Sequence, residues 1–167
     1  ELSNIVKYLD NIAKEQNIKC RPLWLEKIPE DIRIENLALK YKYEKEEYII
    51  NPIIGEYDIP SRQEQALLTL PLTKEGNALI YGSSGSGKEN FITTLLYSSS
   101  MYYSPEEVNY YVVDFGSEVL RMFNDYPIVG DILDSDDEEK IKNLYKMLNA
   151  TIEERKILFS EYNGDYY

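Results

Sequence analysis

The chain contains no histidine and one cysteine, Cys20. The missing histidines exclude histidine-based acid–base catalysis and histidine metal ligands within this chain. One cysteine cannot form a disulfide within the chain, which fits a reducing compartment. Long apolar runs are also missing, because the longest uncharged stretch, Phe91 to Pro105, is rich in Ser, Thr and Tyr. The sequence therefore predicts neither a membrane span nor a secretory leader.

Basic residues are scarce: 18 Lys and Arg stand against 30 Asp and Glu, which gives a net charge of −12. This balance argues against nonspecific binding to nucleic acid or an anionic membrane, since phosphate contacts need clustered Lys and Arg. Proteins and metal-bound nucleotides are the expected partners. Sixteen tyrosines supply core and interface area, although a tyrosine-rich genome composition explains them equally well. The length suits one domain, or an incomplete domain with an N-terminal appendage.

The segment Gly82 to Lys88 has the sequence Gly-Ser-Ser-Gly-Ser-Gly-Lys, the spacing of a phosphate-binding loop. Its glycines let successive N–H groups point into one concavity, and Lys88 would reach the outer phosphates. The apolar run Ala78 to Tyr81 predicts a buried strand before the loop. Helical spacing of apolar residues predicts a helix after it, at Phe91, Ile92, Leu95 and Leu96. This context favours a true phosphate loop over a flexible Gly/Ser loop, with Gly82, Ser83, Ser84, Gly85, Ser86, Gly87, Lys88, Glu89 and Asn90 as the nucleotide-binding residues.

Glu89 follows the lysine, where phosphate loops carry a Ser or Thr whose hydroxyl binds Mg²⁺. A carboxylate about 5 Å from a phosphate oxygen would repel it by roughly 3 kcal/mol at an effective dielectric of about 20. Reduced or altered nucleotide binding is therefore expected. Two alternatives stay open: Glu89 binds Mg²⁺ directly, or it is a surface glutamate beside an ordinary nucleotide site.

The N-terminal third is predicted to be an appendage. Apolar residues predict a helix with Ser3 as its cap, at Ile5, Val6, Leu9, Ile12 and Ala13. Prolines and mixed charges predict a connecting arm from Cys20 to Asn51, anchored by Leu23-Trp24-Leu25, and Lys40 to Glu47 is expected to be a solvated loop. The predicted domains are 1–50, a helix and linker arm, and 51–167, the globular part.

Strands and helices alternate after residue 65. Strands are expected at Ala66 to Leu72, Val108 to Val113 and Gly130 to Leu133, with a turn at Thr73 to Asn77. A helix is expected around Val119, Leu120 and Phe123. A capping box at Ser135 to Glu138 opens a long helix, whose apolar stripe is Ile141, Leu144, Tyr145, Leu148 and Ile152. This order predicts an α/β fold, a parallel sheet flanked by helices with its ligand at the carboxyl ends of the strands.

The triplet Asp114-Phe115-Gly116 resembles the magnesium-binding triplet of protein kinases. The kinase interpretation fails because the kinase catalytic loop needs a histidine and a different phosphate loop. Asp114 also follows an apolar strand, as does the aspartate that orders Mg²⁺ in phosphate-loop enzymes. Phe115, however, stands where a catalytic glutamate often follows. The sequence therefore offers no candidate catalytic residue and no assigned metal ligand.

From about Asn51 onward the chain resembles the FtsK/SpoIIIE family of ATPases. The matching stretches are 55–65, 76–88, 112–118 and 152–159. Within the family it most resembles the type VII secretion coupling ATPases (EssC, YukB and EccC), and Leu23 to Pro29 is similar to the linker entering a later tandem domain, the second. The resemblance implies a P-loop NTPase (RecA-like) fold that is incomplete at the C-terminus, because the family's acidic metal-ordering strand would follow Tyr167.

The resemblance also implies a function and partners. It implies ATP as ligand, with Mg²⁺ in doubt because of Glu89, in a cytoplasmic domain of a membrane-anchored bacterial protein. The partners would be other domains and subunits of the same ATPase, a hexamer in the full protein, and small helical secreted substrates. The alternative is a non-catalytic docking or regulatory module without ATP turnover, so enzymatic activity stays open. DNA pumping is the weakest option because of the negative charge.

Overall fold

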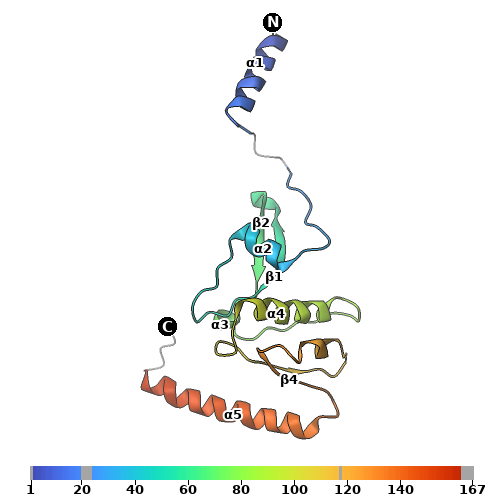
Figure 1. Ribbon diagram of the computed structural model, residues 1–167, viewed down its shortest axis with the longest axis vertical. Helices are drawn as coiled ribbons and strands as arrows, with labels where there is room; N and C mark the ends of the chain where they lie inside the picture. The colour runs from blue at the N-terminus through green and yellow to red at the C-terminus, as the bar shows by residue number, and fades with distance from the viewer. Residues whose placement is uncertain (1, 20–23, 117, 163–167) are drawn as a thin grey trace.

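The computed structural model of the protein describes residues 2–19, 24–116 and 118–162 (Figure 1). Its elements are α1 (Leu2–Glu15), α2 (Ile34–Tyr41), β1 (Ile53–Ile59), η1 (Pro60–Arg62), β2 (Glu64–Thr69), α3 (Leu72–Glu75), α4 (Lys88–Tyr102), β3 (Tyr110–Val113), η2 (Val119–Phe123), β4 (Val129–Leu133) and α5 (Glu138–Glu161). Figure 1 shows an elongated molecule with α1 at one end and α5 at the other. None of the described helices is both long and apolar enough to cross a bilayer.

β1 and β2 form an antiparallel hairpin whose register runs from Ile53 opposite Thr69 to Ile59 opposite Glu64. Helix α2 packs on this hairpin, and Ile34, Leu37 and Ile53 are buried together as one core cluster. The predicted strand at Ala66 to Leu72 is confirmed as far as Thr69. It ends there, and the short helix α3 replaces most of the expected turn at Thr73 to Asn77.

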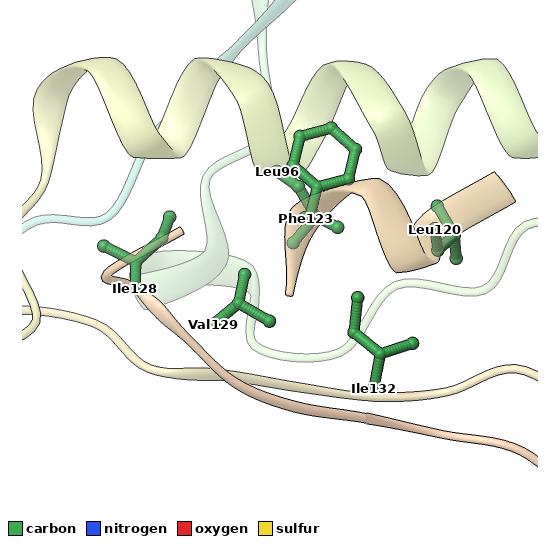
Figure 2. Packing of buried hydrophobic residues seen from close by; sticks show 6 residues of the cluster. All are labelled: Leu96, Leu120, Phe123, Ile128, Val129 and Ile132. Carbon is green, nitrogen blue, oxygen red and sulfur yellow. The ribbon is translucent and has the colours of Figure 1, made fainter. Parts of the chain in front are cut away.

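β3 and β4 form a parallel pair, with Val112 opposite Ile132 and Val113 opposite Leu133. A second core cluster lies between this pair, η2 and α4, and Figure 2 shows its side chains: Leu96, Leu120, Phe123, Ile128, Val129 and Ile132. The expected strands at Val108 to Val113 and Gly130 to Leu133 are confirmed to within two residues. The predicted α/β fold with helices flanking a parallel sheet is therefore confirmed, with a small sheet of two strands.

The expected buried strand at Ala78 to Tyr81 is wrong. These residues form no regular element, and Leu79 and Tyr81 are 87% and 89% exposed. A strand is stable only when its N–H and C=O groups bond to a neighbouring strand. Within the part of the chain that the structure describes, no strand pairs with residues 78–81. Four apolar residues alone were too short a pattern to establish a strand.

The arm before residue 51 is more ordered than expected, because it contains α2. Tyr41 and Tyr43 pack against the cluster of Ile34 and Leu37, so the predicted solvated loop at Lys40 to Glu47 is wrong in its first part. Trp24 is 83% exposed and does not act as an apolar anchor, whereas Leu23 lies outside the described residues. The proposed domain boundary at residue 50 stays a prediction.

Helix ends differ from the sequence expectation more than helix positions do. α1 is confirmed, but it begins at Leu2, so Ser3 lies inside it and is not its cap. α5 is confirmed, but its N-cap is Asp137, which makes no side-chain cap bond. The Asp137 carboxylate instead accepts the N–H of Asp134 at 3.3 Å, because the turn before the helix folds back on it.

Two predicted apolar faces are less buried than expected. The helix around Val119 is the 3₁₀ helix η2, in which Leu120 and Phe123 are buried and Val119 is half exposed. The α5 stripe has no fully buried member. Tyr145, Leu148 and Ile152 are exposed, since none of the described elements packs closely on that side of the helix.

Candidate functional site

The phosphate-loop segment Gly82 to Lys88 connects the exposed residues 78–81 to α4, and its shape depends on glycine. Gly85 and Gly87 have φ angles of +73° and +89°, which side-chain-bearing residues adopt only with strain. A Cβ atom on Gly82 would lie 2.4 Å from the Ser86 hydroxyl oxygen. The backbone of this loop therefore requires glycine at positions 85 and 87, and at position 82 glycine leaves room for the Ser86 side chain.

Helix α4 begins at Lys88, directly after the loop, as predicted from the apolar spacing. Its N-cap is Gly87, and no side chain caps it. The first bond into the helix runs from the Phe91 N–H to the Gly87 carbonyl at 3.0 Å. The N–H groups of the first turn therefore have no partner inside the helix, and with the positive end of the helix dipole they favour an anion.

The Lys88 side chain folds back over the loop. Its Nζ donates to the carbonyl oxygens of Gly82 and Ser83, both at 2.7 Å. These neutral acceptors orient the ammonium group within the loop, where a phosphate oxygen would replace them as a stronger, charge-assisted acceptor. The arrangement brings one fixed cation and a set of backbone donors to the same place.

An open cavity of about 520 Å³ lies against the loop. It is lined by Ser84 to Asn90 and by Gly116, which follows β3. A second cavity of about 260 Å³ also includes Gly116 and lies at the carboxyl ends of β3 and β4. The loop and the strand ends thus form one continuous region, in line with the expected ligand position in a parallel sheet. Gly116 was not among the predicted site residues, although its place after an apolar strand could have identified it.

The carboxylates near the second cavity are engaged in local structure. Asp114 accepts the N–H of Gly116 at 3.0 Å, and Asp134 forms an ion pair with Arg121 and accepts the N–H of Asp136 at 2.9 Å. Across residues 2–19, 24–116 and 118–162, no group of three or more Asp, Glu or Cys side chains is arranged to hold a metal ion.

Glu89 lies in the first turn of α4, is exposed and lines the phosphate-loop cavity. Backbone donors, Lys88 and the start of α4 fit the phosphates of a nucleotide. The donor set fits Mg²⁺ less well, because the position that supplies a neutral hydroxyl in other phosphate loops carries a negative charge.

A buried carboxylate outside the loop fixes α2 to the hairpin. The side chain of Glu56 is 3% exposed and binds both the Lys40 ammonium and the Tyr41 hydroxyl. Lys40 also donates to the Gln65 side-chain oxygen at 3.1 Å. Burial works to raise the pKa of Glu56, but the hydrogen bonds from Lys40 and Tyr41 together outweigh it and lower the pKa below its ordinary value. Sequence reasoning missed this contact because it joins residues 15 or more positions apart.

Curated relatives match nearly the whole length of the chain. The type VII secretion system protein EssC of Staphylococcus aureus is 28% identical over 167 residues, which is 97% of this chain and 11% of EssC. The ESX secretion system protein EccC of Geobacillus thermodenitrificans is 32% identical and covers 96% of this chain. The chain spans about a tenth of the length of these relatives, since it matches 10% of EccC.

Solved structures agree with the sequence relatives. EssC ATPases 2 and 3 from Geobacillus thermodenitrificans match 87% of this chain with a TM-score of 0.62 and 29% identity, and this chain covers 25% of that structure. The cytoplasmic domain of EssC matches 68% with a TM-score of 0.60 and 33% identity, and 22% of that structure is covered. Thermomonospora curvata EccC ATPases 2 and 3, in complex with a signal sequence peptide, match 69% with a TM-score of 0.62 and 28% identity, and 21% of that structure is covered.

A comparison with family profiles places these similarities in one group. The profile described as the FtsK/SpoIIIE family matches residues 39–165, which include the phosphate loop, α4 and all four strands of the two sheets described above. The chain is thus homologous to the EssC/EccC secretion ATPases, and it belongs to the FtsK/SpoIIIE family.

Proposed function

We propose that this chain is an ATPase-type domain of a type VII secretion protein, and that it acts in nucleotide-dependent or regulatory steps of protein export. The observation that carries the proposal is the loop of Gly82 to Lys88, whose positive-φ glycines lead directly into the uncapped start of α4. This geometry suits the phosphates of a nucleotide. The similar ATPases 2 and 3 of EssC and EccC support a later tandem position, the second, for this domain.

The proposed nucleotide-binding residues are those of the loop and the first turn of α4, Gly82 to Asn90. Backbone N–H groups would hold the phosphates, and Lys88 would exchange its two carbonyl acceptors for phosphate oxygens. ATP is the proposed ligand, held weakly because Glu89 places a negative charge beside the phosphates. At about 5 Å the repulsion is roughly 0.8 kcal/mol in bulk water and roughly 3 kcal/mol at an effective dielectric of about 20.

The proposed partners are the neighbouring domains and subunits of the same secretion ATPase, in a hexamer, and small helical secreted proteins. One similar EccC structure contains a signal sequence peptide, which supports a peptide partner for this group of domains. The net charge of −12 opposes a nucleic-acid partner. We place the domain in the cytoplasm, as in the similar cytoplasmic domain of EssC, with any membrane attachment supplied by other parts of the full protein.

Binding of a fluorescent ATP analogue, with and without Mg²⁺, tests the nucleotide proposal. We expect weak binding by the wild-type chain with little effect of Mg²⁺. Replacing Glu89→Thr removes the charge and restores the hydroxyl, so binding should tighten about tenfold and become dependent on Mg²⁺. Glu89→Gln, which removes only the charge, separates the two effects, and Lys88→Ala should abolish binding in every background.

Two results would contradict the proposal. Tight, Mg²⁺-dependent binding by the wild-type chain would show that Glu89 does not impair the site. Absence of binding by both the wild-type and Glu89→Thr chains would show that the loop does not bind nucleotide in this chain.

A non-catalytic docking or regulatory module is the second candidate. Glu89 at the metal position favours it, as does the exposed apolar stripe of α5, which contains Tyr145, Leu148 and Ile152. This function predicts binding of purified small helical secretion substrates at equal strength with and without ATP, and no ATP turnover. Calorimetric titration of the substrate with and without ATP measures the binding, and release of inorganic phosphate measures the turnover. Absence of any substrate binding would count against docking.

A further inference from the structure

An open groove of about 790 Å³ lies beside α4, on the side where Figure 1 shows α2 and β1. The α4 residues that line it are Asn90, Thr93, Thr94 and Tyr97, which share one face of the helix. Asn90 also lines the phosphate-loop cavity, so the two hollows meet at the first turn of α4. At a rise of about 1.5 Å per residue, Tyr97 lies roughly 10 Å farther along the helix axis. The groove therefore leads away from the phosphate loop along α4.

The walls of the groove suit a flat, uncharged ring. Ile32, Ile54 and Leu68 provide aliphatic surface, and Tyr97, which is 37% exposed, provides an aromatic ring. Small-molecule sites of this size are mostly apolar, with a few polar groups that fix the orientation of the ligand. Nucleobases stack on aromatic side chains through their flat faces. A groove with these walls fits the base of a nucleotide.

One carboxylate lies next to the Tyr97 ring. The Tyr97 hydroxyl donates to Oε1 of Glu35 at 2.7 Å, which connects α4 to α2. This hydrogen bond holds the pKa of Glu35 below its ordinary value, so the carboxylate is ionised at neutral pH. An ionised carboxylate accepts hydrogen bonds and cannot donate them. It therefore favours a base that presents an amino group, as adenine does, and disfavours a base with a carbonyl oxygen at that position.

We propose that the groove holds the ribose and base of the nucleotide whose phosphates lie at the loop, and that Tyr97 and Glu35 select adenine. The base would lie against the Tyr97 ring, with its amino group donating to Glu35. Asn90 and Thr93, which lie between the loop and Tyr97, would bond to the ribose hydroxyls. The negative charge of Glu35 favours the triphosphate at the other end, next to Lys88. This inference rests on the proposed function, because it requires phosphates bound at the loop.

Displacement of a fluorescent ATP analogue, labelled on its terminal phosphate, compares ATP, ITP and inorganic tripolyphosphate. ITP has a carbonyl oxygen where ATP has the amino group, and tripolyphosphate has neither base nor ribose. The titrations use the 167-residue chain, both wild type and with Glu89→Thr, in which tighter binding is expected. We expect ATP to bind about tenfold more tightly than ITP, as for a hydrogen bond to a charged group, and at least about tenfold more tightly than tripolyphosphate.

Variants of the groove identify the residues that select the base. Glu35→Gln should bring the affinities of ATP and ITP to within about threefold of each other, because an amide both accepts and donates hydrogen bonds. Tyr97→Ala should weaken ATP binding about fivefold or more and leave tripolyphosphate binding unchanged, since it removes a stacking surface. Tyr97→Phe keeps the ring and should keep ATP binding within about threefold of wild type.

Glu139→Gln on α5 is the matched control for Glu35→Gln. It removes one exposed carboxylate from a helix that does not line the groove, so all three affinities should stay unchanged. Circular dichroism of each variant checks that the fold is intact.

The three probes separate failure of this inference from failure of the proposed function. Equal affinities of ATP and tripolyphosphate would overturn the inference, whereas phosphate binding at the loop would stand. Equal affinities of ATP and ITP in the wild-type chain would show that Glu35 does not select the base, and would also overturn it. If none of the three probes binds to either chain, the proposed nucleotide site is refuted, and this inference with it.

Discussion

A ring of hydrogen bonds connects the segment after α2 to the end of α4. The Tyr43 hydroxyl donates to the Asn51 carbonyl at 2.8 Å, and the Asn51 N–H donates to the Tyr103 hydroxyl at 2.8 Å. The hydroxyl oxygens of Tyr43 and Tyr103 are 3.1 Å apart. Because the Tyr43 hydroxyl already donates its proton to the Asn51 carbonyl oxygen, the Tyr103 hydroxyl must be the donor in this last bond. Burial, and then the bond with Tyr103, raise the pKa of Tyr43 above its ordinary value, so Tyr43 keeps the proton that it donates to the Asn51 carbonyl.

The substitution Tyr103→Phe removes the one oxygen that both accepts from Asn51 and donates to Tyr43. Tyr103 is 6% exposed, so water has little access to replace that oxygen. An unsatisfied buried polar group costs about 1–3 kcal/mol, and we take about 2 kcal/mol for the backbone N–H of Asn51. For a chain of 167 residues, about 2–4 °C per kcal/mol converts this to a fall in Tm of roughly 4–8 °C.

Urea unfolding followed by circular dichroism measures the change, with Tm as a second observable. The matched control is Tyr97→Phe, which removes a surface hydroxyl bonded to Glu35 at 2.7 Å and should change the unfolding free energy by less than about 0.5 kcal/mol. Tyr110→Phe, which loses one bond to the Ser99 hydroxyl at 2.9 Å, should fall between them. If Tyr103→Phe unfolds like Tyr97→Phe, the ring does not contribute to stability and the reasoning is refuted.

Two further stability predictions concern the core and the buried carboxylate. Leu96 is 1% exposed and packs in the cluster that joins α4 to η2 and β4. Leu96→Ala should therefore lower the unfolding free energy by about 2–5 kcal/mol in urea titrations. The control Leu79→Ala, at an exposed position, should change it by less than about 0.5 kcal/mol. Glu56 has a lowered pKa, so it stabilises the fold above its ordinary pKa of 4.5, and this contribution is lost as the pH falls through the lower folded value. Glu56→Gln should therefore lower the unfolding free energy at neutral pH, and it should reduce the loss of unfolding free energy as the pH falls below about 4.5. An unchanged pH dependence of the unfolding free energy in urea titrations would contradict the role of Lys40 and Tyr41.

Local patterns predicted the phosphate-loop region well because its structure has local causes. The glycines at 85 and 87 adopt positive φ angles that their spacing indicated, and the apolar residues after Lys88 form the helix that their period required. The run Ala78 to Tyr81 failed for the opposite reason. A strand depends on a neighbour elsewhere in the chain, and the four residues contain no information about that neighbour.

Long-range contacts explain what the sequence did not show. Helix α2 has only two buried residues, Ile34 and Leu37, and its surroundings are rich in charge, so its short apolar face was hidden in the pattern. The Gln65 to Glu26 bond joins positions 39 residues apart, and Gly116 meets the phosphate loop only after β3 is in place. Sequence reasoning located Gly82 to Asn90 as a candidate site, but not the second wall of its cavity.

Helix α4 connects the candidate site to both parts of the core. Its first residue, Lys88, carries the loop cation, its middle residue Leu96 lies in the cluster with Phe123, and Tyr102 near its end packs against the cluster of Ile34 and Ile53. A helix of 15 residues is a stiff element, so its start cannot shift without moving one of these contacts. Any adjustment of α4 when a ligand enters the loop must therefore be shared with η2 on one side and with β1 on the other, the described elements that α4 contacts most.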